Sequence, residues 1–329
     1  MKGRITVLRL KILIIVLSLS GTVCIHGQWL EAYNYRMKIT IDETMIPGTE
    51  SLIDFPMLFS YTDTLLKSIA FGGEVGFPDG RDIRFTGPDR LSLLEYEFEY
   101  YDPVTGTLVA WVRIPSLPAT VNSEIFLYFG DPQGSPHWNS SEVWSKQYTA
   151  VWHMSDDPSA TAPQITDATS FLNHGTTGGI MAIDDQVEGK ISGGIDFDGV
   201  DDYATMPVNG FNTDSGTVEM WINLDSIPLT TSDYFFAHRQ EGPITDRTYL
   251  RIWDTGEWGT GMGDTYDLVR GSALGTAGWH HLAITWDGTE VWGFLDGMQD
   301  FGPQSYSALD TVREIFIMTW MPSSESADG

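Results

Sequence analysis

The stretch GWHHLAITWDGTEVWGFLDG, residues 278–297, decides the fold class of this chain. Polar or small side chains alternate with apolar ones over residues 281–286, and the alternation resumes over residues 291–295. Each run ends in an Asp-Gly pair, Asp287-Gly288 and Asp296-Gly297. Asp-Gly between alternating runs is the strongest short-range signal for a β-hairpin. The stretch therefore predicts an antiparallel meander in which both residues of each turn have positive φ.

Short strands recur through the rest of the chain. Alternating or apolar runs occur at roughly ten-residue spacing between Gly and Pro residues, a pattern typical of a sandwich or barrel; examples are residues 35–41, 55–59, 96–100, 108–114 and 125–129. Of 329 residues, 34 are Gly, 12 are Trp and 12% are aromatic. This composition suits a turn-rich β protein. We predict an all-β fold with two β-sandwich domains.

The charge of the chain is strongly acidic. It contains 45 Asp and Glu residues against 18 Lys and Arg residues, a formal net charge of −27. An excess of this size repels nucleic acid and anionic lipid and favours cations. We therefore expect no nucleic-acid partner.

Residues 1–28 have the pattern of a secretory signal peptide. Four Lys and Arg residues precede an apolar run over residues 12–23, which is too short to span a bilayer comfortably. Cys24, the single cysteine, lies in this segment. An exported domain without disulfides favours a bacterial source. We expect a secreted or cell-surface protein with no membrane span once the signal is cleaved.

The first domain is expected at residues 29–130, and a linker rich in Pro and Ser at residues 131–149. The order of the segments WLEAYNYRMKITI, IDFPMLF, GRDIRFTGPD, LEYEFEYYD, AWVRIPSLP and EIFLYFGDP resembles a domain-of-unknown-function family found in secreted bacterial proteins beside LamG-like modules. This resemblance implies no known activity.

The second domain is expected at residues 150–329. The segments VWHMSD, DATSFLNHG, GGIDFDGVDDYATMP and TVEMWINL, followed by the meander, resemble the LamG-like (concanavalin A-like lectin/glucanase, jelly-roll) family. The resemblance implies a jelly roll that closes with an apolar strand carrying a Gly-x-Ile-Asp-Glu pattern. Because the sequence ends at SSESADG, we expect a C-terminally truncated chain whose jelly roll lacks its last strand.

No catalytic constellation is evident. A glycosidase needs two carboxylates held across the sugar, and concanavalin A-like glucanases usually place theirs on one strand as Glu-x-Asp-x-Glu. Glu97 and Glu99 in YEFEY are the nearest imitation, and we expect them to be exposed acids on a strand face. The chain has no Gly-x-Ser-x-Gly or His-Glu-x-x-His motif. We expect no catalytic residue and no enzymatic activity.

Calcium is the one cofactor that the residue pattern suggests. Calcium takes several carboxylate and carbonyl oxygens, and two acidic loops that supply them fall at related edges of the LamG-like order. The candidate ligands are Asp167, Asn173, Asp196, Asp198, Asp201 and Asp202. The alternative is that FDGVDDY is a structural turn in which Asp198 caps backbone N–H groups.

Sugar binding would use aromatic faces beside polar groups. The segment RIWDTGEWGTGMGDTYD places rings among small Gly residues that leave them uncovered, and we place the ring of Trp258 on a loop. The candidate residues are Trp253, Trp258, Tyr266, Arg239 and Asp264. The alternative is that Trp253 and Tyr266 are half-buried residues of the sandwich.

These observations favour a non-catalytic extracellular protein whose LamG-like domain binds a glycan or a cell-surface polysaccharide. Two alternatives stay open. In the first alternative, the chain is a structural or adhesive spacer without sugar binding. In the second, it is an accessory region of a larger polysaccharide-degrading enzyme.

Overall fold

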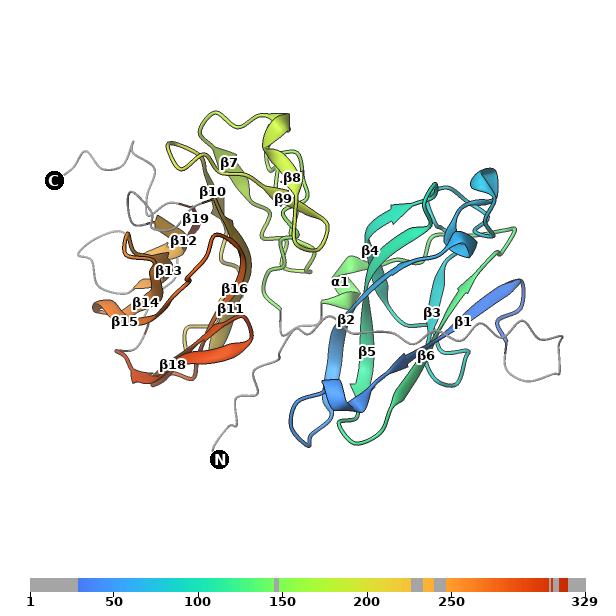
Figure 1. Ribbon diagram of the computed structural model, residues 1–329, viewed down its shortest axis with the longest axis horizontal. Helices are drawn as coiled ribbons and strands as arrows, with labels where there is room; N and C mark the ends of the chain where they lie inside the picture. Colours follow the sequence, from blue (N-terminus) through green and yellow to red (C-terminus); the bar gives the residue numbers. More distant parts are fainter. Residues whose placement is uncertain are drawn as a thin grey trace. The chain divides into compact units, whose positions relative to one another are not determined.

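The computed structural model describes residues 29–144, 148–225, 233–239, 247–307, 309 and 314–318, with only the backbone described at Asp233 and Arg239. The chain divides into two compact units, Met1–Tyr148 and Thr149–Gly329 (Figure 1). Both units are built almost entirely from β-strands, as predicted. The expected signal peptide, residues 1–28, and the C-terminal residues 319–329 lie outside the described residues.

The first unit contains two three-stranded antiparallel sheets. One has the order β1-β6-β3 and the other β2-β5-β4. The strands are β1 (Tyr35–Ile41), β2 (Leu52–Thr62), β3 (Arg84–Thr86), β4 (Tyr96–Asp102), β5 (Thr107–Leu117) and β6 (Ser123–Phe129). The short helical turns are η1 (Glu43–Met45), η2 (Thr64–Leu66), η3 (Ile69–Phe71) and α1 (Ser140–Val143). In β1 the alternation places Met37, Ile39 and Ile41 in the core, where they meet Phe59, Phe85 and Leu127.

A buried carboxylate joins two loops of the first unit. Asp82 is completely buried, and its Oδ2 accepts hydrogen bonds from the backbone N–H of Gly76 at 2.7 Å and of Gly130 at 2.9 Å. Burial raises the pKa of this carboxyl above its ordinary value, although the backbone donors oppose the shift. Asp82 thus holds the loops before β3 and after β6 together by accepting hydrogen bonds from both. Burial at the same time disfavours the charged form of its carboxyl.

The segment expected to be a linker packs on the first unit over most of its length. The ring of Trp138 contacts Phe98, and the Asn139 N–H donates to the Tyr96 carbonyl. Trp144 at the end of α1 is buried and donates its indole N–H to Glu97 Oε1 at 2.6 Å. Residues 131–144 therefore belong to the first unit.

The second unit contains a seven-stranded sheet, a four-stranded sheet and a two-stranded sheet. Their orders are β15-β14-β13-β12-β19-β10-β7, β11-β16-β17-β18 and β8-β9. The elements are β7 (Thr176–Gly178), η4 (Ile183–Asp185), β8 (Gln186–Glu188), β9 (Gly193–Ile195), β10 (Tyr203–Met206), β11 (Gly216–Leu224), β12 (Asp233–Arg239), β13 (Arg247–Ile252), β14 (Glu257–Gly263), β15 (Thr265–Ala273), β16 (Gly278–Trp286), β17 (Glu290–Leu295), β18 (Met298–Ser305) and β19 (Glu314–Ile317).

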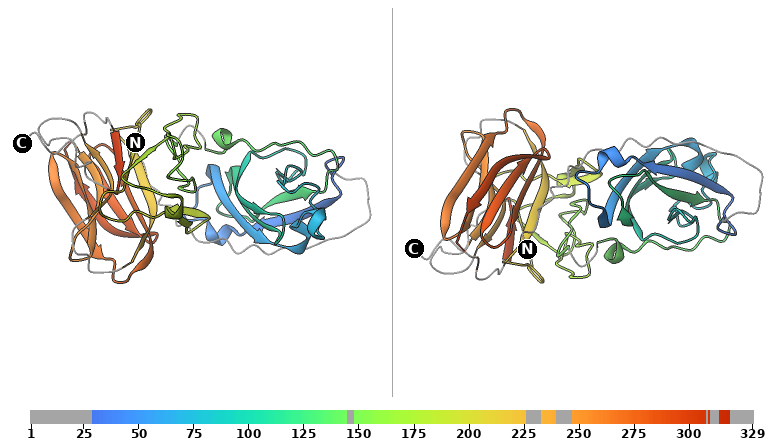
Figure 2. Two further views of the ribbon diagram at one scale, coloured as in Figure 1. Left: turned by 90° about the horizontal axis from the view of Figure 1, so that it is seen from above. Right: turned by 90° about the horizontal axis from the view of Figure 1, so that it is seen from below.

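The two larger sheets form a sandwich around a common core, and their layers can be followed in Figure 2. The apolar residues of the meander lie in this core, as the alternation predicts: Leu282, Ile284 and Trp286 from β16, and Val291 from β17. β19 lies between β12 and β10, in the interior of the seven-stranded sheet. Near the start of the unit, Trp152 forms an isolated antiparallel bridge with Asp167.

The two Asp-Gly turns differ. Asp296 and Gly297 both have positive φ, 49° and 75°, and Leu295 pairs with Met298 across them, which confirms the predicted two-residue turn. At the first turn only Gly288 has positive φ. Asp287 instead accepts hydrogen bonds at Oδ1 from the backbone N–H groups of residues 289 and 290. The meander was predicted correctly, but the conformation of its first turn was not.

Among the residues that the structure describes, no helix combines the length and the apolar character needed to cross a membrane.

Candidate functional site

The strand β13 presents two different faces. Thr248, Leu250 and Ile252 alternate with Arg247, Tyr249 and Arg251 because successive side chains of a strand point to opposite sides of the sheet. Leu250 and Ile252 enter the core of the sandwich, whereas Tyr249 packs in a separate small cluster with Ala237, Phe316 and Tyr234. Tyr249 and its alternating neighbours therefore lie on the outer face of the seven-stranded sheet.

Glycines in the neighbouring strand β14 make room for the aromatic rings of this face. A Cβ on Gly261 would lie 2.5 Å from Cε1 of Tyr249, and a Cβ on Gly259 would lie 3.0 Å from Cζ3 of Trp253. Such glycines inside a strand mark a close approach of another group to the backbone. The rings of Tyr249 and Trp253 thus lie directly against the backbone of β14.

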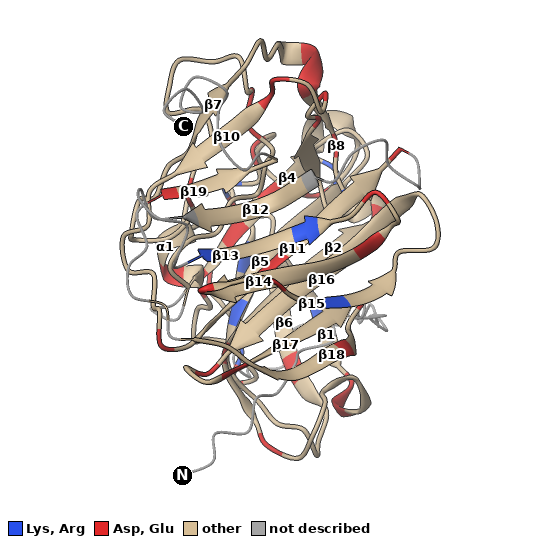
Figure 3. Cartoon of the chain, turned by 90° about the vertical axis from the view of Figure 1, so that its left-hand side faces the viewer, with Lys and Arg blue, Asp and Glu red and all other residues tan. Residues whose placement is uncertain are grey.

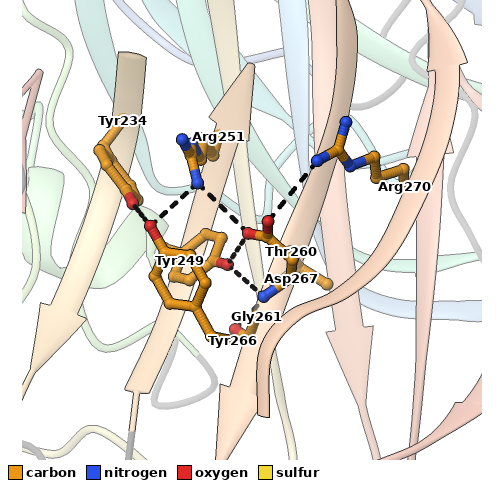
Figure 4. Close-up of polar contacts among 8 residues, drawn as sticks. All are labelled: Tyr234, Tyr249, Arg251, Thr260, Gly261, Tyr266, Asp267 and Arg270. Carbon is orange, nitrogen blue, oxygen red and sulfur yellow. Dashed lines mark hydrogen bonds and ion pairs between the residues drawn. The ribbon is translucent and has the colours of Figure 1, made fainter. Parts of the chain in front are cut away.

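Asp267 organises the polar groups of this face (Figure 4). Its Oδ1 accepts hydrogen bonds from Tyr249 Oη at 2.8 Å and from Arg251 Nη1 at 3.2 Å, and its backbone N–H donates to Tyr249 Oη at 2.7 Å. Its Oδ2 lies 3.6 Å from Arg270 Nη2. One carboxylate therefore joins a tyrosine and two arginines from β13 and β15.

A local irregularity of β15 aims Asp267 into this position. The pairing of β14 with β15 shifts between Thr260 and Met262, so residues 266–268 face a single residue of β14. Asp267 has φ of 51°, in the left-handed region that non-glycine residues rarely adopt. Extra residues of this kind bend a strand and redirect side chains, often next to binding sites.

Arginines and aromatic rings are interleaved around this carboxylate. The guanidinium carbon of Arg251 lies 4.9 Å from the ring centre of Tyr234 and that of Arg270 lies 4.2 Å from Trp253, within the range of cation–π attraction. Arg251 Nη1 also donates to Tyr266 Oη at 3.0 Å, and the Tyr266 and Tyr234 hydroxyls are hydrogen-bonded to each other. We refer to these groups as the arginine–aromatic face; its members are Tyr234, Arg247, Tyr249, Arg251, Trp253, Tyr266, Asp267 and Arg270.

Two phenols of this face, those of Tyr234 and Tyr249, have raised pKa values. Burial raises the pKa of Tyr249 and of Tyr234 well above the ordinary tyrosine value, and a hydrogen bond to Asp267 or Tyr266 adds to the shift in each case. Arginine is charged at every relevant pH. The face therefore combines the neutral hydroxyls of Tyr234 and Tyr249 with fixed positive charges near neutral pH.

The distribution of charge sets this face apart from the rest of its unit. Residues 149–329 contain 28 Asp and Glu residues but six Lys and Arg residues. Three of the six, Arg247, Arg251 and Arg270, belong to the arginine–aromatic face. Figure 3 views the seven-stranded sheet from this side, with basic positions in blue and acidic positions in red.

The five predicted sugar-binding residues do not form one group. Tyr266 is 48% exposed and belongs to the arginine–aromatic face, whereas Trp253 belongs to it but is only 3% exposed. Asp264 is exposed at the turn between β14 and β15, where its N–H donates to Ser307 Oγ. The side chain of Arg239 lies outside the described residues.

The prediction for Trp258 is wrong. It lies in β14 rather than on a loop, its side chain is completely buried, and it packs in the core against Phe301. Its indole N–H donates to Asp300 Oδ2 at 2.8 Å. The Gly residues beside it are strand residues beneath the rings of Trp253 and Tyr249, so they do not mark a loop.

Two of the predicted calcium ligands are already occupied by protein donors. Asp167 Oδ1 accepts from the N–H groups of Val151 and Thr169, and its Oδ2 accepts from Thr169 Oγ1 and from the N–H of Asn173. The Asn173 side chain accepts from the Asn209 N–H through Oδ1 and donates through Nδ2 to the Thr149 and Asn209 carbonyls. Asp167 and Asn173 therefore join loops of the second unit through hydrogen bonds to protein groups.

The remaining acidic residues form a smaller cluster. Asp198, Asp201 and Asp202 each place one carboxylate oxygen within 4.8 Å of the others and could hold a metal ion. Asp198 also accepts the N–H groups of residues 200–202 at Oδ1, as the structural-turn alternative predicts. Asp196 is exposed and is not part of the cluster.

Glu97 and Glu99 are not two free acids on a strand. Glu97 is buried rather than exposed, and it accepts the Trp144 indole N–H; Glu99 Oε2 accepts the Trp111 indole N–H at 3.0 Å. The rings of Trp111 and Trp144 are themselves in contact. The expectation of exposure is therefore wrong for Glu97 because the end of α1 covers it.

Several members of the arginine–aromatic face were not predicted from the sequence, among them Tyr234, Tyr249, Arg251, Asp267 and Arg270. The signal for two of them was present. Residues 247–253, RTYLRIW, alternate with period two, so Tyr249 and Arg251 share a face with Trp253. Asp267 and Arg270 could not be found in this way because the irregular pairing of β15 decides which way they point.

Comparison with known proteins agrees with this architecture. Residues 198–318 match the model of the concanavalin A-like lectin/glucanases superfamily, and residues 79–171 match that of a domain of unknown function, DUF2341. The chain thus carries a DUF2341 domain followed by a concanavalin A-like domain, which confirms the predicted order. No curated protein matches the chain.

Solved structures similar to the chain include two sugar-bound proteins. Domain 4 of an extracellular arabinanase from Geobacillus stearothermophilus, in complex with arabinotriose, is 20% identical over 47% of this chain and 79% of that chain, with a TM-score of 0.38. The Trypanosoma rangeli sialidase in complex with sialic acid is 12% identical over 72% of this chain and 41% of its own length, with a TM-score of 0.42. TM-scores of this size do not support the transfer of a site.

Proposed function

We propose that the second unit is a non-catalytic, lectin-like module that binds a glycan on the arginine–aromatic face. A concanavalin A-like domain fits a carbohydrate-binding module. The observation that carries the proposal is the placement of Tyr266, an exposed ring whose hydroxyl accepts a hydrogen bond from Arg251. Arg251 is in turn held by Asp267. An exposed ring thus stands beside donors that are already oriented.

The chemistry of this arrangement suits a sugar. An aromatic face offers apolar area to the C–H groups of a pyranose ring, while its polar edge and the neighbouring guanidinium groups can bond hydroxyls. Because Asp267 holds Arg251, less side-chain entropy is lost when a ligand binds.

We propose in addition that the protein is secreted or displayed at the cell surface. The basic and then apolar pattern of residues 1–28 supports this localisation. The absence of catalysis in this chain is likewise a proposal. It is supported by the indole partners of Glu97 and Glu99, which engage the two acids that most resemble a glycosidase pair.

Calcium is the cation that we propose for the cluster of Asp198, Asp201 and Asp202. Calcium prefers carboxylate oxygens, and three are already close together here. The pKa of Asp202 is raised, first by burial and further by the negative charges of Asp198, Asp185 and Asp201. A bound cation would offset that repulsion and stabilise the turn before β10.

The proposed function is tested by calorimetric titration of the whole chain with oligosaccharides chosen from a glycan array. Tyr266→Ala should weaken binding about tenfold or more, which corresponds to about 1.4 kcal/mol. The matched control is Tyr100→Ala in β4, because Tyr100 is equally exposed, at 48%, but lies in the first unit. Equal affinities of Tyr266→Ala and wild type for a bound glycan would place the site elsewhere. The absence of any glycan ligand would favour the structural or adhesive spacer.

A further inference from the structure

The arginine–aromatic face is rich in positive charge, whereas the unit that carries it is acidic. Its unit has an excess of acids, 28 Asp and Glu residues against six Lys and Arg residues, yet three of those six lie together here. Arginine presents a planar fork of donors that matches the two oxygens of a carboxylate or sulfate. We propose that the glycan bound by this face is anionic, with its carboxylate or sulfate group contacting Arg270 and Arg251 and its sugar ring lying against Tyr266. This inference rests on the proposed function and adds the class of ligand.

Arg270 is the arginine best placed to meet such a group. Its side chain is 45% exposed, and its ionic contact is a long one, 3.6 Å from Nη2 to Asp267 Oδ2. The guanidinium otherwise lies over the ring of Trp253. Arg251 is more enclosed, with 14% of its side chain exposed, and is held by Asp267 and Tyr266. Arg270 can therefore turn toward a ligand while Arg251 stays fixed.

Asp267 does not neutralise the two arginines. It is one carboxylate shared by Arg251 and Arg270, and it also accepts the hydroxyl of Tyr249. The pKa of Glu257 is lowered, first by the hydrogen bond from the Thr255 hydroxyl and also by the positive charge of Arg270, so a second carboxylate lies near the face. A ligand anion would accept hydrogen bonds from the exposed donors of Arg270, whose contact with Asp267 is a long one, and charge-assisted hydrogen bonds of this kind are stronger than neutral ones.

An unpaired donor lies beneath Arg270. The indole N–H of Trp253 is buried and has no hydrogen-bond partner among the described residues. Buried donors are normally paired, so one that is not requires an explanation. Because the exposed side chain of Arg270 covers this ring, its movement toward a ligand would bring an acceptor oxygen within reach of Trp253. The unpaired N–H and the exposed arginine point to the same ligand position.

The test compares the whole chain with Arg270→Gln and with Lys190→Gln. Lys190 is a matched control because its Nζ also lies over an aromatic ring of the second unit, 5.2 Å from the ring centre of Trp221. It is not a member of the arginine–aromatic face. The probes are oligogalacturonates, sulfated galactan oligomers, neutral gluco- and galacto-oligosaccharides and poly-glutamate. We expect the wild type to bind one of the two anionic glycans at least about tenfold more tightly than the neutral sugars. Arg270→Gln should lose that preference and Lys190→Gln should keep it.

The outcomes separate this inference from the proposed function. Tighter binding of neutral sugars would overturn the anionic ligand but keep the glycan site, whereas binding of no sugar would overturn both. If poly-glutamate binds as tightly as the glycans, the binding is unspecific attraction between charges and the inference is overturned. The same holds if Lys190→Gln loses the preference for anionic glycans as fully as Arg270→Gln does. Retained preference in Arg270→Gln would also overturn it. Loss of binding at acid pH identifies a carboxylate ligand, and pH-independent binding identifies a sulfate; both results support the inference.

Discussion

Replacement of Trp258 by alanine tests whether this residue belongs to the hydrophobic core or to the binding site. The side chain of Trp258 is completely buried between the two larger sheets and contacts Phe301. Truncation of a buried Trp to Ala typically costs about 3–5 kcal/mol. The hydrogen bond to Asp300 is lost as well, but Ser272 still donates its N–H and its hydroxyl to that carboxylate, so no buried charge is left without a donor. We therefore expect a loss within the 3–5 kcal/mol range.

Scanning calorimetry of the second unit measures this loss. For a unit of this size 1 kcal/mol corresponds to about 2–4 °C, so the midpoint should fall by roughly 6–20 °C. The control is Tyr266→Ala, for which we expect a loss below about 1 kcal/mol because the ring is at the surface. A Trp258→Ala variant that melts like the wild type but no longer binds glycan would refute the placement of Trp258 in the core.

Three further predictions concern other parts of the chain. Burial raises the pKa of Asp82, so its carboxyl favours folding most at acid pH and loses that contribution as pH rises; the stability of Asp82→Asn relative to wild type should therefore increase with pH in urea titrations, and a pH-independent difference would contradict this. Gly261→Ala should cost about 1–3 kcal/mol by overpacking against Tyr249 and should weaken glycan binding, whereas Gly87→Ala, which meets nothing closer than 3.7 Å, should be nearly neutral in thermal melts. Millimolar calcium should raise the melting midpoint of the wild type but not of Asp198→Ala, and identical midpoints in calcium and in chelator would exclude the site.

The fold was largely predictable because its signals are local. The alternation of residues 281–286 and the pair Asp296-Gly297 need no distant partner to be recognised. The conformation of the first turn was not predictable from the Asp-Gly pair, because the Asp287 side chain bonds backbone N–H groups there and so supports a different turn.

The candidate site was predictable only in part. Tyr266 was found because an exposed ring beside Gly residues is visible in the sequence, but the same reasoning failed for Trp258. In both cases Gly was taken as a sign that the ring is uncovered, whereas Gly259 and Gly261 are strand residues that the rings of Trp253 and Tyr249 cover. That contact depends on the pairing of two strands and on which face each presents. The contact between these rings and the glycines of β14 therefore cannot be predicted from sequence spacing alone.

The acidic residues show a second limit. Asp167 and Asp198 look alike in sequence, since each is the first residue of a polar loop. Asp167 is buried and accepts four hydrogen bonds from protein donors, whereas Asp198 lies exposed beside Asp201 and Asp202. Both carboxylates accept backbone N–H groups, and how far each is enclosed by protein donors depends on how loops distant in sequence come together.

We propose that the second unit binds its glycan on the outer face of β12 to β15. This proposal is tested most directly by a crystal structure of the chain with the tightest-binding oligosaccharide of the panel. We expect a sugar ring against Tyr266 and an anionic group within hydrogen-bond distance of Arg270. A sugar bound instead at the loop of Asp198, or anywhere in the first unit, would contradict it.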